Sequence, residues 1–188
     1  MPGKIYLINQ DEEVRFLNNF SRHPVTMGGE TYETSEHYYQ AAKFFRTDPE
    51  WAKKVAEAKG PAACKKLGNS REHKIQENWN EIWALIYMEK VLIRKARQHE
   101  CVMNQLMATG HDYIVERADW DDIWGDGPYG YGRNQLGRLW MKVRRYFETG
   151  KMEEFVKVCP LCFGKSVDDN VIDCPTCKNS GVVEVAKF

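Results

Sequence analysis

Signals that start and stop helices follow one another from residue 34 to residue 150, and they constrain the fold more than any other feature. Thr34 and Ser35 can cap the helix that begins "SEHYYQAAKFF", and Asp48-Pro49 can start the next one. Glycines stand where later periodic segments end. The expected helices span residues 35–45, 49–60, 79–99, 101–110 and 135–150. The sequence therefore predicts a mainly α-helical body.

Shorter patterns precede these helices. Residues 4–8, 14–20 and 24–33 are typical of strands and turns, and Gly28-Gly29 predicts a hairpin turn in the last of them. Residues 121–134 hold four glycines and a proline and predict a loop. A chain of 188 residues, 43% of them hydrophobic, can bury one ordinary core. We expect one compact domain over residues 1–150 and a separate tail over 151–188.

The tail is defined by four of the six cysteines of the chain. They form two CxxC pairs, a spacing that suits tetrahedral structural zinc in a small ribbon, with no open position for catalysis. Two redox-active pairs are the alternative, although no thioredoxin-like βαβ pattern accompanies them. The predicted zinc ligands are Cys159, Cys162, Cys174 and Cys177.

The charge of the tail bears on its partners. From residue 159 onward, three lysines face four carboxylates, and zinc on four thiolates would add further negative charge. This is a poor surface for phosphates, so a clamp, a dimer contact or a protein-docking module suits the tail at least as well as nucleic-acid binding.

The totals exclude some classes of protein. Lys plus Arg and Asp plus Glu are both 27, so the chain lacks the overall positive field of a non-specific nucleic-acid binder. No apolar run approaches the ~20 residues that span a bilayer, and the first residues lack a signal-peptide core. We therefore expect a cytoplasmic protein that does not bind membranes.

Two segments carry candidate site residues. Glu36, Gln40 and Lys43 lie on one face of the first helix, where they form either a solvated stripe or the floor of a site. In the loop, carboxylates precede an indole, a combination that can stack a flat ring and stabilise positive charge; a mobile loop with an anchoring tryptophan is the alternative. The loop candidates are Asp121, Trp124, Gly125 and Asn134.

A basic face follows the loop. Arg138, Lys142 and Arg145 recur at helical spacing with Arg144 beside them, and such a face can receive a phosphate or can simply be solvated. Trp79 heads the long helix, where an aromatic residue is more often part of a core than a stacking surface.

Taken together, these segments resemble a known family. "GETYETSEHYYQAAKFF", "NW" before the long helix, "LMATGHDYIVE" and "DDIWGDGPYGYGRNQLGRLWMKVR" resemble the NADAR or YbiA-like family over residues 14–148. The resemblance implies a compact helical YbiA-like domain with short N-terminal strands. It also implies an N-glycosidase that cleaves the bond between a 5′-phosphorylated ribose and a nitrogen base, and no catalytic cofactor.

The resemblance assigns roles to individual residues. Glu36, Lys43 and Asp121 match the catalytic positions, and Trp79, Trp124 and Asn134 match substrate-binding ones. Lys43 can bind the sugar or a phosphate, or can attack C1′ of an opened sugar as an amine. Two departures stand out. The family's Gly-Arg pair is Gly68-Asn69 here, which removes a cation, and its Lys-Phe pair is Lys95-Ala96.

Two substrate classes are associated with the family: ADP-ribose attached to guanine, free or in nucleic acid, and the phosphoribosylamino-pyrimidine intermediates of riboflavin synthesis. An appended zinc module slightly favours the first. A different class of function, a module that binds ADP-ribose or NAD without turnover, and a zinc-tailed adaptor whose helical domain is a scaffold are the remaining alternatives.

Overall fold

The computed structural model describes residues 2–7, 14–150, 156–158 and 182–185. Helices dominate the described part. They are α1 (Ser35–Ala42), α2 (Pro49–Ala56), α3 (Pro61–Gly68), α4 (Ala84–Gln98), α5 (Glu100–Ala108) and α6 (Gln135–Thr149). The strands are short: β1 (Lys4–Leu7), β2 (Val25–Met27), β3 (Glu30–Tyr32), β4 (Tyr113–Glu116), β5 (Val156–Val158) and β6 (Val182–Val185). The prediction of a mainly helical body with a few short strands is confirmed.

Local capping explains where the first helices begin. The side chain of Thr34 accepts a hydrogen bond from the backbone N–H of His37, and Asp48 accepts one from Trp51. Proline at the first position of α2 and of α3 removes a donor that would have no partner there. Gly28 and Gly29 both have positive φ and make the tight β2–β3 turn, as expected.

Two expectations about local structure were wrong. Residues 14–20 do not form a strand but contain the single 3-10 turn η1 (Arg15–Leu17). The long helix does not start at Trp79, because the π turn η2 (Trp79–Trp83) precedes α4 and follows Asn78 at φ 55°. β4 also pairs with β1 in parallel, and no local sequence pattern predicts this long-range contact.

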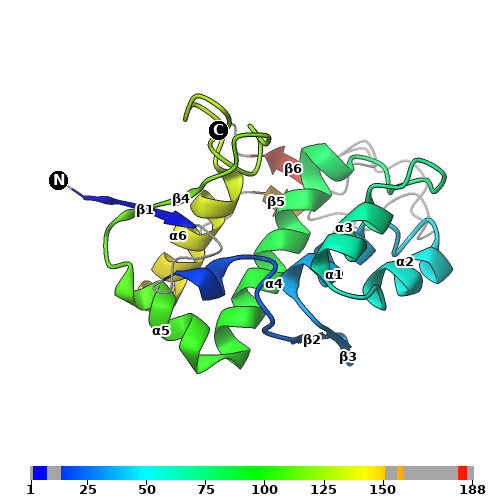
Figure 1. Ribbon diagram of the computed structural model, residues 1–188, viewed down its shortest axis with the longest axis horizontal. Helices are drawn as coiled ribbons and strands as arrows, with labels where there is room; N and C mark the ends of the chain where they lie inside the picture. The colour runs from blue at the N-terminus through cyan, green and yellow to red at the C-terminus, as the bar shows by residue number, and fades with distance from the viewer. Residues whose placement is uncertain (1, 8–13, 151–155, 159–181, 186–188) are drawn as a thin grey trace.

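The helices pack around α4, which runs through the middle of the molecule with α1–α3 on one side and α5 and α6 on the other (Figure 1). Trp140 of α6 is fully buried, and its indole N–H donates to the carbonyl of Leu17. α6 also packs against β4. The β4–α6 connection is thereby held beside α1, where the candidate residues of both segments meet.

The end of α6 at Thr149 is close to the predicted domain boundary at residue 150, which itself stays a prediction. The predicted zinc ligands Cys159, Cys162, Cys174 and Cys177 lie outside the described residues. Among the helices that the structure describes, none is both long and apolar enough to cross a bilayer.

Candidate active site

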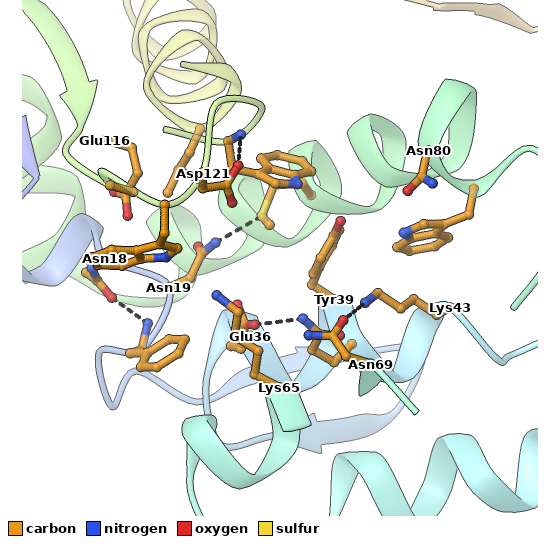
Figure 2. Close-up of a pocket in the computed structure, with 18 residues that line it drawn as sticks. Asn18, Asn19, Glu36, Tyr39, Lys43, Lys65, Asn69, Asn80, Glu116 and Asp121 are labelled. Atoms are coloured by element: carbon orange, nitrogen blue, oxygen red, sulfur yellow. Dashed lines mark hydrogen bonds between the residues drawn. The ribbon is translucent and has the colours of Figure 1, made fainter. Parts of the chain in front are cut away.

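One cavity of about 330 Å³ opens between α1, α3, η2 and the β4–α6 connection (Figure 2). Its walls are polar and aromatic and come from segments that are far apart in the sequence. The lining residues are Asn18, Asn19, Phe20, Glu36, Tyr39, Gln40, Lys43, Lys65, Asn69, Trp79, Asn80, Met88, Glu116, Ala118, Trp120, Asp121, Trp124 and Leu136.

Glu36 lies on the α1 wall and is buried. Its Oε1 accepts a 2.8 Å hydrogen bond from Nε2 of Gln40, one turn further along the helix. Burial raises the pKa of Glu36, while the Gln40 bond and the nearby Lys65 and Lys43 oppose that shift. The predicted stripe is therefore the floor of a cavity and not a solvated face.

Lys43 lies at the C-terminal end of the same helix and is also buried. Its Nζ donates to the carbonyl of Gly68 at 3.1 Å and to Oδ1 of Asn69 at 2.8 Å. Burial lowers the pKa of Lys43 to about 8, although the charge of Glu36 opposes this. At pH 7 this lysine is still mostly charged, and roughly a tenth of it is the neutral amine that a nucleophile requires.

Gly68 permits the close approach of α3 to α1. A Cβ atom at this position would lie 2.1 Å from Oε1 of Gln40, which would displace the side chain that donates to Glu36. The departure at Asn69 has a structural consequence as well. Where the resemblance leads us to expect a cation, this chain places an amide oxygen that accepts a hydrogen bond from Lys43.

Asp121 enters the cavity from the β4–α6 connection. Its Oδ1 accepts hydrogen bonds from the backbone N–H groups of Ile123 and Trp124, at 3.0 and 2.8 Å. Asp121 lies across the cavity from Glu36 (Figure 2). The structure thus brings together Glu36, Gln40, Lys43 and Asp121, four predicted residues from two distant segments.

Sequence reasoning missed a third acidic side chain, Glu116, at the end of β4. Burial and then the charge of Asp121 raise its pKa to about 8. Its Oε2 is enclosed and has no hydrogen-bond partner among the residues that the structure describes. A signal was present: Glu116 follows the apolar residues Ile114 and Val115, but only the β1–β4 pairing turns it toward the site.

The aromatic residues divide into buried and exposed ones. Trp79 lines the cavity but is only 2% exposed, because it stacks on Tyr87 and packs against Tyr39. Trp124 packs edge-on against Tyr39. Trp120 also lines the cavity and is 82% exposed, although sequence reasoning did not select it. Of the cavity tryptophans, Trp120 is the one with an open face for a flat ligand.

Four other predicted substrate-binding residues do not line the cavity. Asn134 is buried at φ 50° and ties β4 to α6, since its side chain bonds to the backbone of Glu116 and Ile114. Gly125 is buried, and a Cβ there would meet Ala118. Asn134 and Gly125 therefore shape the β4–α6 connection.

The two arginines are the other predicted residues outside the cavity. Arg144 is buried and donates to Thr109 and to the carbonyl of Asp112. Arg138 is partly exposed on α6 and is absent from the lining. The cation that does line the cavity with an exposed side chain is Lys65 of α3.

Among the residues that the structure describes, no group of three or more His, Cys, Asp or Glu side chains is arranged to hold a metal ion. The expectation that the reaction needs no catalytic cofactor stays a prediction.

The chain is similar to proteins of known type. The model of the NADAR domain family matches residues 5–148. N-glycosidase YbiA of Escherichia coli strain K12 is 35% identical over 135 residues, which cover 72% of this chain and 82% of that protein. A riboflavin biosynthesis protein of Vibrio vulnificus is 36% identical over 144 residues, covering 77% of this chain and 38% of the relative. The NMR structure of E. coli YbiA superimposes with a TM-score of 0.72 at 31% identity, covering 82% of this chain and 90% of that one.

Proposed function

The chain belongs to the NADAR domain family, and from this premise we propose that it is an N-glycosidase that hydrolyses the ribosyl C1′–N bond of a 5′-phosphorylated riboside. The observation that carries the proposal is the meeting of Glu36, Asp121 and Lys43 in one cavity. Relatives named N-glycosidase support the same class of reaction.

The chemistry requires groups of this kind. As the C1′–N bond breaks, positive charge develops at C1′ and on the ring oxygen, and a carboxylate beside them stabilises it or activates water. Glu36 suits this role because Gln40 orients it. Burial raises its pKa, and the hydrogen bond from Gln40 and the charges of two nearby lysines oppose that shift. Asp121 supplies a second carboxylate from the opposite wall.

The cations and aromatic rings would bind the rest of the substrate. Lys65 and Lys43 line the cavity and can receive the 5′-phosphate or the ribose hydroxyls. Lys43 can also act as an amine toward an opened sugar. Trp120 offers the exposed indole on which a base can stack at the mouth.

Two substrate classes suit this site. The appended tail slightly favours ADP-ribosyl-guanine, free or in nucleic acid. A specific observation favours the phosphoribosylamino-pyrimidines of riboflavin synthesis as the second candidate. The cavity, at about 330 Å³, is at the small end of the ~300–1,000 Å³ range of ligand pockets, and a mononucleotide-sized substrate suits it. Two relatives are named riboflavin biosynthesis proteins.

For the tail, we propose a structural zinc ion on Cys159, Cys162, Cys174 and Cys177. Antiparallel pairing of β5 with β6 places Val158 opposite Val182, which brings together the two ends of the segment that contains all four cysteines. Four thiolates complete a tetrahedral site. Metal analysis of the purified protein should find one zinc per chain and should find none after Cys174 and Cys177 are both changed to Ser.

The deciding experiment uses two substrates with the purified protein. One is an oligonucleotide with ADP-ribosylated guanine; the other is 5-amino-6-(phosphoribosylamino)pyrimidine. We expect release of the free base, or of unmodified oligonucleotide, and its loss in Glu36→Gln and Lys43→Ala. Glu50→Gln, an exposed carboxylate on α2 outside the cavity, is the matched control and should keep full activity.

Each outcome of this experiment has a different meaning. Release from only one substrate identifies the substrate class. If neither substrate is cleaved while ADP-ribose or NAD still binds, the chain is a binding module and the proposal fails. Equal activity in Glu36→Gln and Glu50→Gln would leave the cavity without a catalytic role.

A further inference from the structure

Glu116 is held in place by its own backbone. Its N–H donates to Oδ1 of Asn134 at 2.9 Å, and its carbonyl accepts from the N–H of Asp126 at 2.9 Å. β4 pairs with β1 up to this residue, where Leu7 is its partner. The side chain therefore leaves the sheet at a fixed point on the cavity wall, beside Asp121 (Figure 2).

The surroundings of the Glu116 carboxyl disfavour a negative charge. Its Oε2 is enclosed and receives no hydrogen bond from any residue in the described part of the chain. The neighbouring charges are mostly acidic: Asp121 and Asp126 lie on the following connection and Glu36 on α1, whereas Lys65 on α3 is a cation. Burying a charged carboxylate oxygen without a hydrogen-bond donor, beside other carboxylates, costs free energy, whereas the neutral acid needs only one acceptor for its proton.

The adjacent arginine does not offset the negative charge of an ionised Glu116. Arg117 directs its guanidinium to Asp126 at 2.8 Å and to Asp119 at 3.6 Å. Together, burial and the surrounding carboxylates raise the pKa of Glu116 to about 8, so it carries a proton at neutral pH.

The two other carboxyl groups of the cavity differ from Glu116. Burial raises the pKa of Glu36 as well, but the hydrogen bond from Gln40 and the charges of Lys65 and Lys43 oppose that shift. Asp121 uses Oδ1 to accept two backbone N–H groups. Where environments separate two carboxyl groups in this way, one can act as an acid and the other as a base or charge stabiliser.

We propose that Glu116 is the general acid of the reaction and donates its proton to the nitrogen of the departing base. The inference rests on the proposed N-glycosidase function. In the forward step, the electron pair of the C1′–N bond goes to that nitrogen, which takes the proton of Glu116. Water forms the new C1′–O bond and loses one proton to Glu36. Release of this proton from Glu36 and uptake of one by Glu116 restore the site, so that one water is consumed per bond cleaved.

The test compares Glu116→Gln, Glu116→Asp and the control Asp119→Asn. Asp119 is an exposed carboxylate three residues along the chain, outside the cavity, and its change should leave activity unaltered. Each protein is assayed between pH 5 and pH 9.5 on whichever of the two ribosides the wild type cleaves. Thermal melting confirms that each variant is folded; Glu116→Asp keeps a proton donor if the amide variant does not fold.

We expect the wild-type rate to fall as pH rises through about 8, because Glu116 then loses its proton. Glu116→Gln should lower kcat by roughly 10²–10⁴-fold and remove this alkaline decline. Because Lys43 has a pKa close to that of Glu116, Lys43→Arg is assayed to separate the two titrations. The activity that remains in Lys43→Arg should still decline as pH rises through about 8.

The leaving group provides an independent measurement. Nicotinamide riboside 5′-phosphate has a pyridinium leaving group that departs neutral without a proton. The fall in kcat caused by Glu116→Gln should therefore be at least ten times smaller on this probe than on the pyrimidine or guanine riboside. If the wild type does not cleave the probe, the pH profiles decide whether Glu116 is the general acid. An alkaline decline that persists in Glu116→Gln, or a loss below threefold, would overturn the assignment. Failure of the wild type on every riboside would instead defeat the proposed function.

Discussion

Oδ1 of Asn69 accepts a 2.8 Å hydrogen bond from Nζ of Lys43, at the position where relatives are expected to have an arginine. Together with the carbonyl of Gly68, this bond holds the lysine in the cavity that also contains Glu36. At this position the chain thus has an amide that orients Lys43, where the family pattern leads us to expect a cation.

Asn69→Asp should raise the pKa of Lys43 above its present value of about 8, because a carboxylate would then adjoin the ammonium group. NMR titration of labelled lysine side chains measures the shift. Activity that needs the neutral amine should move to higher pH by a similar amount. Asn69→Ala, which adds no charge, is the control, and an identical lysine titration in both variants would contradict the prediction.

Gln40→Met should shift the acidic limb of the pH–activity profile to higher pH. Removing the 2.8 Å bond leaves Glu36 without that donor, so its already raised pKa rises further, and the ionised form that assists the reaction is lost at higher pH. We expect kcat/KM at pH 6 to fall about tenfold, equivalent to about 1.4 kcal/mol. Gln98→Met, an exposed change on α4, should not move the limb.

Trp120→Ala should raise KM with little change in kcat. Loss of one base-stacking contact costs about 1–3 kcal/mol, which corresponds to roughly 5- to 150-fold. Trp120→Phe should recover much of the loss. Tyr131→Ala is the matched control, because it also removes an exposed aromatic side chain: Tyr131 is 93% exposed and lies outside the cavity. Equal KM values for the two alanine variants would remove the stacking role of Trp120.

Lys95→Met should change both the cavity wall and the pH dependence of stability. Nζ of Lys95 donates to the carbonyl of Asn18 at 2.8 Å and to Oγ of Ser21 at 2.7 Å, which fixes the wall segment that contains Asn18 and Asn19. Without these bonds we expect KM to rise several-fold. Lys90→Met, an exposed lysine on the same helix, is the control.

The sign of the stability effect follows from the pKa of Lys95, which burial lowers from 10.5 to about 7. Between these pH values the unfolded chain binds more protons than the folded one, so the free energy of unfolding contributed by this group rises with pH. The slope approaches about 1.4 kcal/mol per pH unit inside the window. Urea unfolding at pH 7 to 10 should show a smaller rise in Lys95→Met, and an unchanged rise would contradict the assignment.

Sequence reasoning identified the elements whose signals are local. Thr34 and Asp48 cap α1 and α2, and the glycines 28 and 29 make the hairpin turn, as expected. The interaction that decides each of these features spans only a few residues. The strand expected over 14–20 was wrong because that segment is folded by distant contacts, such as the bond from Trp140 to Leu17.

The candidate site was predictable in part. Helical periodicity and the family pattern selected Glu36, Gln40 and Lys43, and the loop pattern selected Asp121; all four line the cavity. The same patterns could not separate ligand-facing residues from supporting ones. Their orientations depend on the packing of α6 against β4, which buries Arg144 and Asn134.

The sequence by itself determined the helical class, the caps and the family, because each depends on residue types at short, regular spacing. Only the tertiary structure decided which side chains share the cavity and how each is charged. Glu116 reaches the site through parallel pairing of β4 with β1, across more than a hundred residues of chain. Its protonation follows from burial among Asp121, Asp126 and Glu36, and this is a property of the assembled interior that no single segment contains.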